Sequence, residues 1–202
     1  NKEGIKLKLF INPGHMKMGA PRSQKGQRAN EFQKKIRLTK SFYASIFEIT
    51  NGQYGKFKPS LRKSLGSDDV PVTSIDWNEA ASFCNWLSLN EGLQPFYKIV
   101  NERVNGFNRN TDGYRLLSEA EWEWLSRKAG KTKQTIFSWG DEMVIPPNVA
   151  NVSDESAKGQ MKFYVPNYND GYVSAAPVGS FKKELSGLYD IAGNVSEWVH
   201  DI

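Results

Sequence analysis

Residues 187–198 read Gly187-Leu188-Tyr189-Asp190-Ile191-Ala192-Gly193-Asn194-Val195-Ser196-Glu197-Trp198. They mix apolar residues, glycines and acids too closely for a regular helix or strand. Asp190, Asn194 and Glu197 offer hard oxygen atoms, and Gly193 allows the backbone to turn so that carbonyl groups point inward. This composition is typical of a loop wrapped around a cation.

Working outward, the composition predicts one globular domain. The chain has 202 residues, of which 39% are apolar and 12% aromatic, enough for a core and too many for a disordered chain. No window approaches the roughly 18 apolar residues of a membrane span, so none is predicted. The chain begins at Asn1, and its compartment is therefore left open.

The formal charge is +5, and much of the basic excess lies early in the chain. A nucleic-acid or anionic surface is one interpretation of this excess, and a solvated face is the other. The basic residues are not interleaved with stacking aromatics, and no nucleic-acid motif is present. We therefore predict a solvated face and no nucleic-acid partner.

Local patterns predict short helices and strands separated by long loops. Alternating apolar residues predict strands over 5–11, 36–42 and 97–100. Three capping boxes predict helix starts, at Thr50 with Gln53, Asp76 with Glu79 and Ser118 with Glu121. Gly92 and Gly130 are placed to end the second and third helices. Residues 59–70 and 141–187 read as loops, which is unusual in a compact domain unless something fixes them.

The chain resembles the formylglycine-generating enzyme (sulfatase-modifying factor) superfamily over residues 11–201. The motifs that carry the resemblance occur in the family's order: Pro13-Gly14-His15-Met16-Lys17-Met18-Gly19, Glu48-Ile49-Thr50, Pro71-Val72 with Trp77 and Cys84, Tyr114-Arg115-Leu116-Leu117-Ser118-Glu119-Ala120-Glu121-Trp122-Glu123, Phe137-Ser138-Trp139-Gly140, and the stretch quoted first. The chain departs from the pattern at Ser196, where the family's enzymes have Trp.

The resemblance implies an α+β fold of the C-type-lectin-like kind, with few short helices and strands and long ordered loops. Residues 1–202 would form a single domain of this family that lacks the C-terminal part of the fold. We therefore expect an unpaired sheet edge and exposed apolar surface, and a second chain is a candidate to complete the fold.

The resemblance also implies structural calcium at two sets of oxygen ligands. The first set is Asn151 and Asp170 with the carbonyls of Val152 and Tyr172. The second set is Asp190 and Glu197 with the carbonyls of Gly193 and Val195. The alternative is that Asn151 and Asp170 cap turns, and that Glu197 pairs with an arginine in the core. We expect a metal ion in at least one of the two sets.

The resemblance implies no catalytic residue within 1–202. The family's oxidases hold copper between two cysteines of a C-terminal segment, and this sequence has only Cys84. Cys84 stands on the apolar face of a predicted helix, so we interpret it as a buried small residue and not as a reactive thiolate. Arg115, Glu119, Glu121 and Glu123 have the chemistry of acid–base groups, but we interpret them as structural.

Two functions remain as hypotheses. The first is a non-catalytic binding or scaffold module, in which calcium-stiffened loops present a surface to a protein or small ligand. Residues 163–168 are a candidate contact surface, or else pack beneath the long loop. The second is the N-terminal part of a copper-dependent oxidase that acts on a cysteine of a sulfatase-type substrate, because the family continues beyond the point where this sequence stops.

Overall fold

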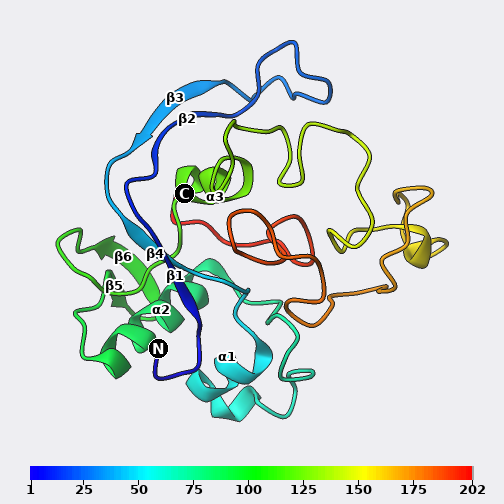
Figure 1. The fold of residues 1–202 in the computed structure, drawn as a ribbon. Helices are drawn as coiled ribbons and strands as arrows, with labels where there is room; N and C mark the ends of the chain where they lie inside the picture. Colours follow the sequence, from blue (N-terminus) through cyan, green and yellow to red (C-terminus); the bar gives the residue numbers. More distant parts are fainter. Residues whose placement is uncertain (202) are drawn as a thin grey trace.

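The computed structural model describes residues 1–201, and these form the predicted α+β arrangement of short elements and long loops. The described helices are α1 (Asn51–Phe57), α2 (Trp77–Glu91) and α3 (Glu119–Arg127), with two short 3-10 turns, η1 (Pro59–Leu61) and η2 (Glu155–Ala157). The described strands are β1 (Leu7–Phe10), β2 (Gly14–Met18), β3 (Lys34–Leu38), β4 (Phe42–Ser45), β5 (Tyr97–Val100) and β6 (Arg103–Phe107). Figure 1 shows the helices on either side of the C-terminal stretch.

The strands pair into three antiparallel, two-stranded sheets: β1 with β4, β2 with β3, and β5 with β6. The single strand predicted over 36–42 is therefore wrong, because β3 and β4 belong to different sheets. The break has a local cause. Asn12 adopts φ 46° and donates its backbone N–H to the Ser41 hydroxyl, and Pro13 has no N–H to continue the ladder. Figure 1 shows the two sheets as one long, bent ribbon.

The expected unpaired edges are present. Each of these sheets has only two strands within residues 1–201, so β1 and β4 each have one outer edge without a strand partner. Leu9 and Tyr43, on this pair of strands, are 41% and 62% exposed. No helix within the described residues is long and apolar enough to cross a membrane.

All three predicted capping boxes are confirmed in full. Thr50, Asp76 and Ser118 each accept a hydrogen bond from the backbone three residues on, and the side chain at that position bonds back to the cap. Gly92 ends α2 in the left-handed conformation at φ 74°, as predicted. α3 ends earlier than predicted, with Lys128 as its cap, and Gly130 follows at φ 72°.

Replacing Ser118 by Ala should lower the free energy of unfolding by about 1 kcal/mol, because the α3 N-terminus loses the hydroxyl that accepts the Glu121 amide hydrogen. Urea denaturation followed by tryptophan fluorescence measures this change. Ser118→Thr is the matched control and should retain the wild-type midpoint. Equal stability of the wild type and the Ala variant would show that the cap contributes nothing.

The apolar core is divided among three clusters. The first packs the β1–β4 ribbon on α3, with Phe10 and Leu125 at its centre. The second surrounds α1 and α2, with Tyr54 and Phe83. The third lies between α2 and the β5–β6 sheet. Residues 114–117 contact all three clusters through Tyr114, Leu116 and Leu117, and a second connection runs through hydrogen bonds.

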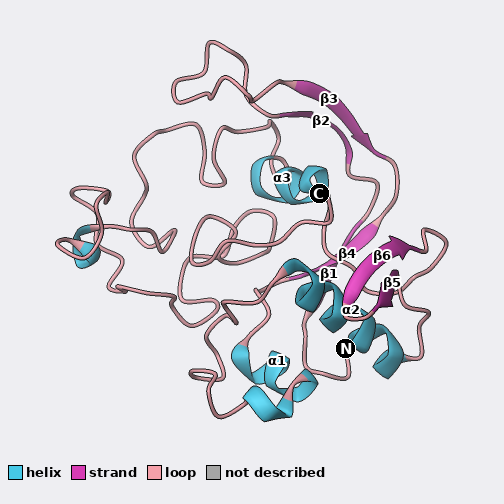
Figure 2. Cartoon of the chain, turned by 180° about the vertical axis from the view of Figure 1, so that it is seen from behind, coloured by secondary structure: helices cyan, strands magenta, loops and turns pink. Residues whose placement is uncertain are grey.

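The C-terminal stretch provides that connection. Figure 2 shows how little regular structure the chain has between α3 and its end, and the final residues run back among the helices. Each of these residues bonds to a different part of the fold: Tyr189 N to Ile46 O, Asn194 N to Asn151 O, Trp198 Nε1 to Ile75 O, Trp77 Nε1 to Val199 O, His200 N to Leu117 O, and Glu119 N to Asp201 Oδ2. The stretch that identifies the fold by sequence therefore also ties it together.

Candidate cation-binding site

The second predicted ligand set begins at Asp190, which is 5% exposed. Its backbone adopts φ 60°, a left-handed conformation that is uncommon for residues other than glycine. Oδ2 accepts a hydrogen bond from the Gly179 N–H at 2.6 Å. Oδ1 is buried and has no hydrogen-bond partner within residues 1–201. A buried carboxylate oxygen in this state requires a proton or a cation.

Glu48 is the residue that the sequence analysis missed. It is 9% exposed, and Oε1 accepts a hydrogen bond from Asn194 Nδ2 at 3.0 Å while Oε2 is buried without a partner. Burial, and then the charge of nearby Asp190, raises the pKa of Glu48 to about 8. Burial also raises the pKa of Asp190. The fold thus places two buried carboxyl groups together, and within residues 1–201 neither of them forms an ion pair.

Asn194 joins this pair to the first ligand set. Its Oδ1 accepts hydrogen bonds from Ala176 N at 2.8 Å and from Asn151 Nδ2 at 3.2 Å, while its own Nδ2 reaches Glu48. The backbones also meet, because Asn194 N donates to Asn151 O at 2.9 Å. A Cβ atom on Gly193 would lie 2.2 Å from that same carbonyl oxygen, so only glycine fits there. The two predicted loops are therefore one connected network.

The remaining members of the second set lie on its outer side. Glu197 Oε2 accepts a hydrogen bond from Trp122 Nε1 at 2.5 Å, and not from the arginine that was the alternative expectation. Glu197 is exposed, and its side chain borders a cavity. The Gly193 carbonyl accepts a hydrogen bond from Val195 N at 2.8 Å. Within residues 1–201 no three Asp, Glu, His or Cys side chains already form a metal-binding group.

The first set has a different character, because both carboxylate oxygens of Asp170 already accept hydrogen bonds. Asp170 accepts hydrogen bonds from Tyr172 N and Val152 N, both at 2.8 Å. Asp154, which the sequence analysis did not select, is fully buried and accepts a hydrogen bond from Asp170 N at 2.5 Å. Asn151 Nδ2 donates to Ser174 O at 2.8 Å. Asp170 thus caps a turn in this structure, whether or not a cation joins it.

The two sets therefore differ in how well their residues fit a calcium ion. Glu48 and Asp190 supply orphaned, buried oxygens of the kind that calcium prefers, beside a loop with a distorted backbone. Asp170, the carboxylate of the first set, has no buried oxygen without a partner within residues 1–201. On this criterion the second set, extended by Glu48, is the better candidate.

The signature helix carries a structural ion pair, and the structural interpretation of its charges agrees with the geometry. Arg115 makes two hydrogen bonds to the Glu121 carboxylate, both at 2.7 Å, and Glu121 also accepts from Ser118 N at 2.8 Å. Glu123 pairs with Arg127 one helical turn on. These carboxylates have guanidinium partners, so they are not poised to exchange protons.

Cys84 is buried in the third core cluster, as expected. Burial raises the pKa of its thiol to about 12, so very little thiolate exists near neutral pH. We therefore expect a thiol reagent such as Ellman's reagent to react with less than about 5% of the native protein at pH 8. The same protein in guanidinium chloride should react completely. Fast reaction of the native protein would contradict this placement.

A cavity of about 590 Å³ lies beside the cation network, and the sequence did not predict it. Its wall is mostly apolar and is drawn from β1, β4, α2 and the C-terminal stretch. Three charged residues face it, Glu48, Arg115 and Glu197. Its size and its mixture of an apolar wall with a few charged groups are typical of small-molecule sites.

The candidate contact loop over residues 163–168 is divided. Tyr168 packs inward, and its hydroxyl donates to Ala150 O at 2.8 Å. Phe163 is 78% exposed. One end of this loop therefore packs inward, and the other end is exposed; the contact surface stays a prediction.

Comparison with known proteins identifies the family. The model of the FGE-sulfatase family, described as the sulfatase-modifying factor enzyme 1-like domain, matches residues 2–202. The chain belongs to this family. Solved structures of the family's fold agree: CarF superposes with a TM-score of 0.69 at 24% identity, covering 98% of this chain and 80% of CarF. PvdO from Pseudomonas aeruginosa superposes with a TM-score of 0.69 at 23% identity, covering 100% of this chain and 72% of PvdO.

Relatives of this sulfatase-modifying-factor domain include proteins named for different roles. The chaperone protein LppX of Paenibacillus barcinonensis is 27% identical over 175 residues, 78% of this chain and 61% of LppX. The mouse formylglycine-generating enzyme is 32% identical over 139 residues, 68% of this chain and 28% of the enzyme. The mouse inactive C-alpha-formylglycine-generating enzyme 2 is 29% identical over 132 residues, 64% and 32% of the two chains. The domain thus spans less than two thirds of each of these relatives.

Proposed function

We propose that this chain acts as a non-catalytic, sulfatase-modifying-factor-like binding or scaffold module, whose loops are stiffened by calcium. The observation that carries the proposal is that Cys84, the one thiol of the sequence, is buried and protonated. The family's oxidases hold copper between two cysteines, whereas the single Cys84 lies in the core with its thiol protonated. Residues 1–202 therefore supply no pair of thiolates for copper.

Calcium would be held by the second ligand set together with Glu48. Asp190, Glu197 and Glu48 would supply carboxylate oxygens, and Gly193 and Val195 would supply carbonyls. The ion would neutralise two buried carboxylates and cross-link segments that are far apart in sequence. Because Asn194 connects these residues to the first set, ordering one loop would also order the other. A structural ion of this kind performs no chemical step.

Two surfaces are available for a ligand in this proposal. The cavity bordered by Arg115 and Glu197 suits a small molecule with an apolar body and a polar end. The exposed end of the 163–168 loop, with Phe163, suits a protein surface. The cavity also borders the cation network, through Glu48 and Glu197.

Copper separates this proposal from the enzyme alternative. We expect the full-length protein, with any residues that follow Ile202, to form no copper(I)–thiolate charge-transfer band and to leave a cysteine-containing sulfatase-type peptide unoxidised. Mass spectrometry of the peptide, with a copper-loaded formylglycine-generating enzyme as the positive control, provides the measurement. Conversion of the peptide cysteine to formylglycine by the full-length protein would overturn the non-catalytic assignment.

A further inference from the structure

A strongly basic segment extends over one side of the molecule. We call residues 14–38 the basic arm; it consists of β2, β3 and their connection, and Figure 1 shows it at the top of the molecule. It contains seven lysines and arginines and a single acid, Glu31. The basic residues are Lys17, Arg22, Lys25, Arg28, Lys34, Lys35 and Arg37. Within residues 1–201 none of them forms an ion pair.

The charge of the chain is divided unevenly. Its first 40 residues hold eleven lysines and arginines against two acids, although the whole chain carries a net charge of only +5. The remaining residues are therefore net negative. Seven of these eleven basic residues lie in the basic arm, so a positive potential gathers there and attracts anionic partners.

The exposed face of the arm places two positive charges, Lys17 and Lys35, directly opposite one another. His15 pairs with Arg37 across β2 and β3, and Lys17 pairs with Lys35. All four side chains are exposed, while Met16 and Ile36 between them face the core. Like charges opposite one another on a sheet oppose folding. An anionic ligand would remove this repulsion on binding.

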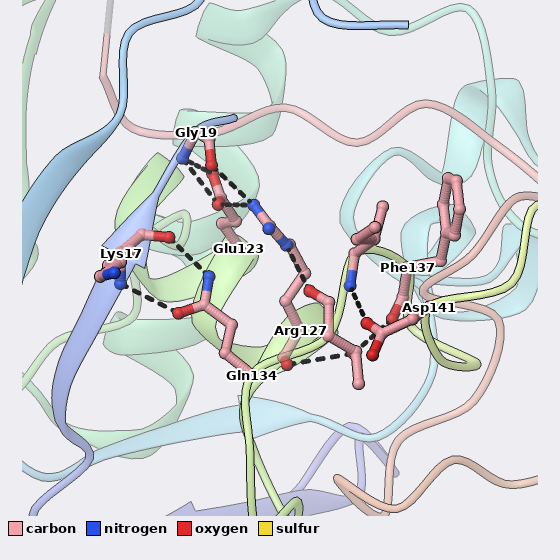
Figure 3. A network of polar contacts seen from close by, with 9 residues as sticks. Lys17, Gly19, Glu123, Arg127, Gln134, Phe137 and Asp141 are labelled. Atoms are coloured by element: carbon pink, nitrogen blue, oxygen red, sulfur yellow. Dashed lines mark hydrogen bonds and ion pairs between the residues drawn. The ribbon is translucent and has the colours of Figure 1, made fainter. Parts of the chain in front are cut away.

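An open groove of about 820 Å³ runs beside these residues. Its lining includes Lys35 and three glutamines, Gln24, Gln33 and Gln134. Gln134 is already used, because its amide bonds to both the N–H and the C=O of Lys17, at 2.9 and 2.5 Å (Figure 3). This glutamine satisfies the outer edge of β2 as a neighbouring strand would. In this groove a glutamine amide thus already binds the N–H and C=O groups of an extended main chain, that of β2 itself.

We propose that the basic arm and its groove form a docking surface for an extended, acidic segment of a protein partner. Side chains two residues apart on a strand are about 6.6 Å apart, which is also the spacing of alternate residues in an extended peptide. Alternate Glu or Asp residues would therefore meet Lys17 with Lys35, and His15 with Arg37, in register. The amides of Gln24 and Gln33 would bond to the main chain of the peptide, while Gln134 stays bonded to Lys17.

The same residues do not suit other polyanions. The arm has one aromatic residue, Phe32, and its ring lies against the Arg22 guanidinium at 5.8 Å. It thus lacks the row of aromatic rings on which nucleic-acid bases stack. It also lacks the cluster of large apolar side chains that inserts into a bilayer. The inference goes beyond the proposed function, and its failure would leave the assignment of Cys84 and of the cation network unchanged.

Fluorescence anisotropy with a labelled peptide of about 12 residues, alternating Glu and Thr, tests the proposal at low salt. The variant Lys17→Gln/Lys35→Gln/Arg37→Gln should weaken binding about tenfold. The matched control, Lys63→Gln/Lys98→Gln/Arg103→Gln, removes the same charge from exposed residues elsewhere and should weaken binding less than about twofold. The single substitution Lys35→Glu should also weaken binding. It should not destabilise the sheet, because the new carboxylate lies opposite the Lys17 ammonium group.

Equal loss of affinity in the arm variant and the control would overturn the proposal, because it would show attraction by net charge alone. Tighter binding to a single-stranded oligonucleotide or to phosphatidylserine vesicles than to the peptide would overturn it in favour of those partners. Thermal unfolding accompanies each titration. The arm variant should unfold no earlier than the wild type, since it loses repulsion between paired residues.

Discussion

Glu48→Gln is expected to stabilise the calcium-free protein at pH 8.5 and to abolish most of its stabilisation by calcium. In the wild type the pKa of Glu48 is about 8 in the folded state, against an ordinary value of 4.5. Between pH 4.5 and about pH 8, Glu48 therefore keeps its proton in the folded protein but has lost it in the unfolded chain. The contribution of this proton to the free energy of unfolding is fully present below about pH 4.5 and is lost as the pH rises through 8.

The shift of the Glu48 pKa from 4.5 to about 8 corresponds to roughly 5 kcal/mol, and most of this is already lost at pH 8.5, so the Gln variant should exceed the calcium-free wild type at that pH by roughly 4 kcal/mol. Gln retains an oxygen for Asn194 and offers its amide hydrogens to the orphaned Asp190 oxygen. Urea denaturation in a chelator, from pH 5 to 9, measures the difference. Glu102→Gln, an exposed site, is the control and should leave the pH profile unchanged. A Gln variant less stable than the wild type in chelator would contradict this account of Glu48.

Gly193→Ala is expected to cost about 3 kcal/mol or more of unfolding free energy. The new Cβ would lie 2.2 Å from the Asn151 carbonyl oxygen, and φ at this position is 151°. The contact is between two backbones, so no flexible side chain can move aside. Relief requires the two loops to separate, which would break the hydrogen bond from Asn194 N to Asn151 O. Calcium binding should weaken together with stability.

Gly140→Ala is the matched control for this substitution. Gly140 has nearly the same φ, 146°, but a Cβ there would meet nothing within 4 Å. It therefore reports the conformational cost alone, roughly 1–3 kcal/mol, and the difference between the two variants isolates the contact between the loops. Chemical denaturation of both proteins provides the comparison. Equal losses would show that the loops are not held together at Gly193.

The elements with strong local signals could be predicted from the sequence. The capping boxes at Thr50, Asp76 and Ser118 place a polar side chain and its partner three residues apart, and nothing distant alters that pairing. The break between β3 and β4 was missed because it depends on which strand each pairs with. No pattern within residues 36–42 carries that information.

The candidate site could be predicted only in part, for a similar reason. Asp190 and Glu197 were found because they lie in one short stretch with glycines. Glu48 was missed because it is more than 140 residues away from Asp190 in sequence, and only the fold brings their carboxyl groups together. The state of Asp170 in the first set could not be predicted either. Its carboxylate accepts hydrogen bonds from two backbone N–H groups, and their positions depend on the conformation of the whole loop.

A calcium titration of chelator-stripped protein at pH 8, followed by isothermal calorimetry and thermal unfolding, tests the central claim most directly. The account predicts at least one bound calcium per chain and a rise in unfolding temperature, equivalent to about 3 kcal/mol at a hundredfold excess over the dissociation constant. Glu48→Gln/Asp190→Asn should remove this response. An unfolding temperature that is unchanged by millimolar calcium, in a wild type that remains folded in chelator, would contradict the claim that these carboxylates hold a cation.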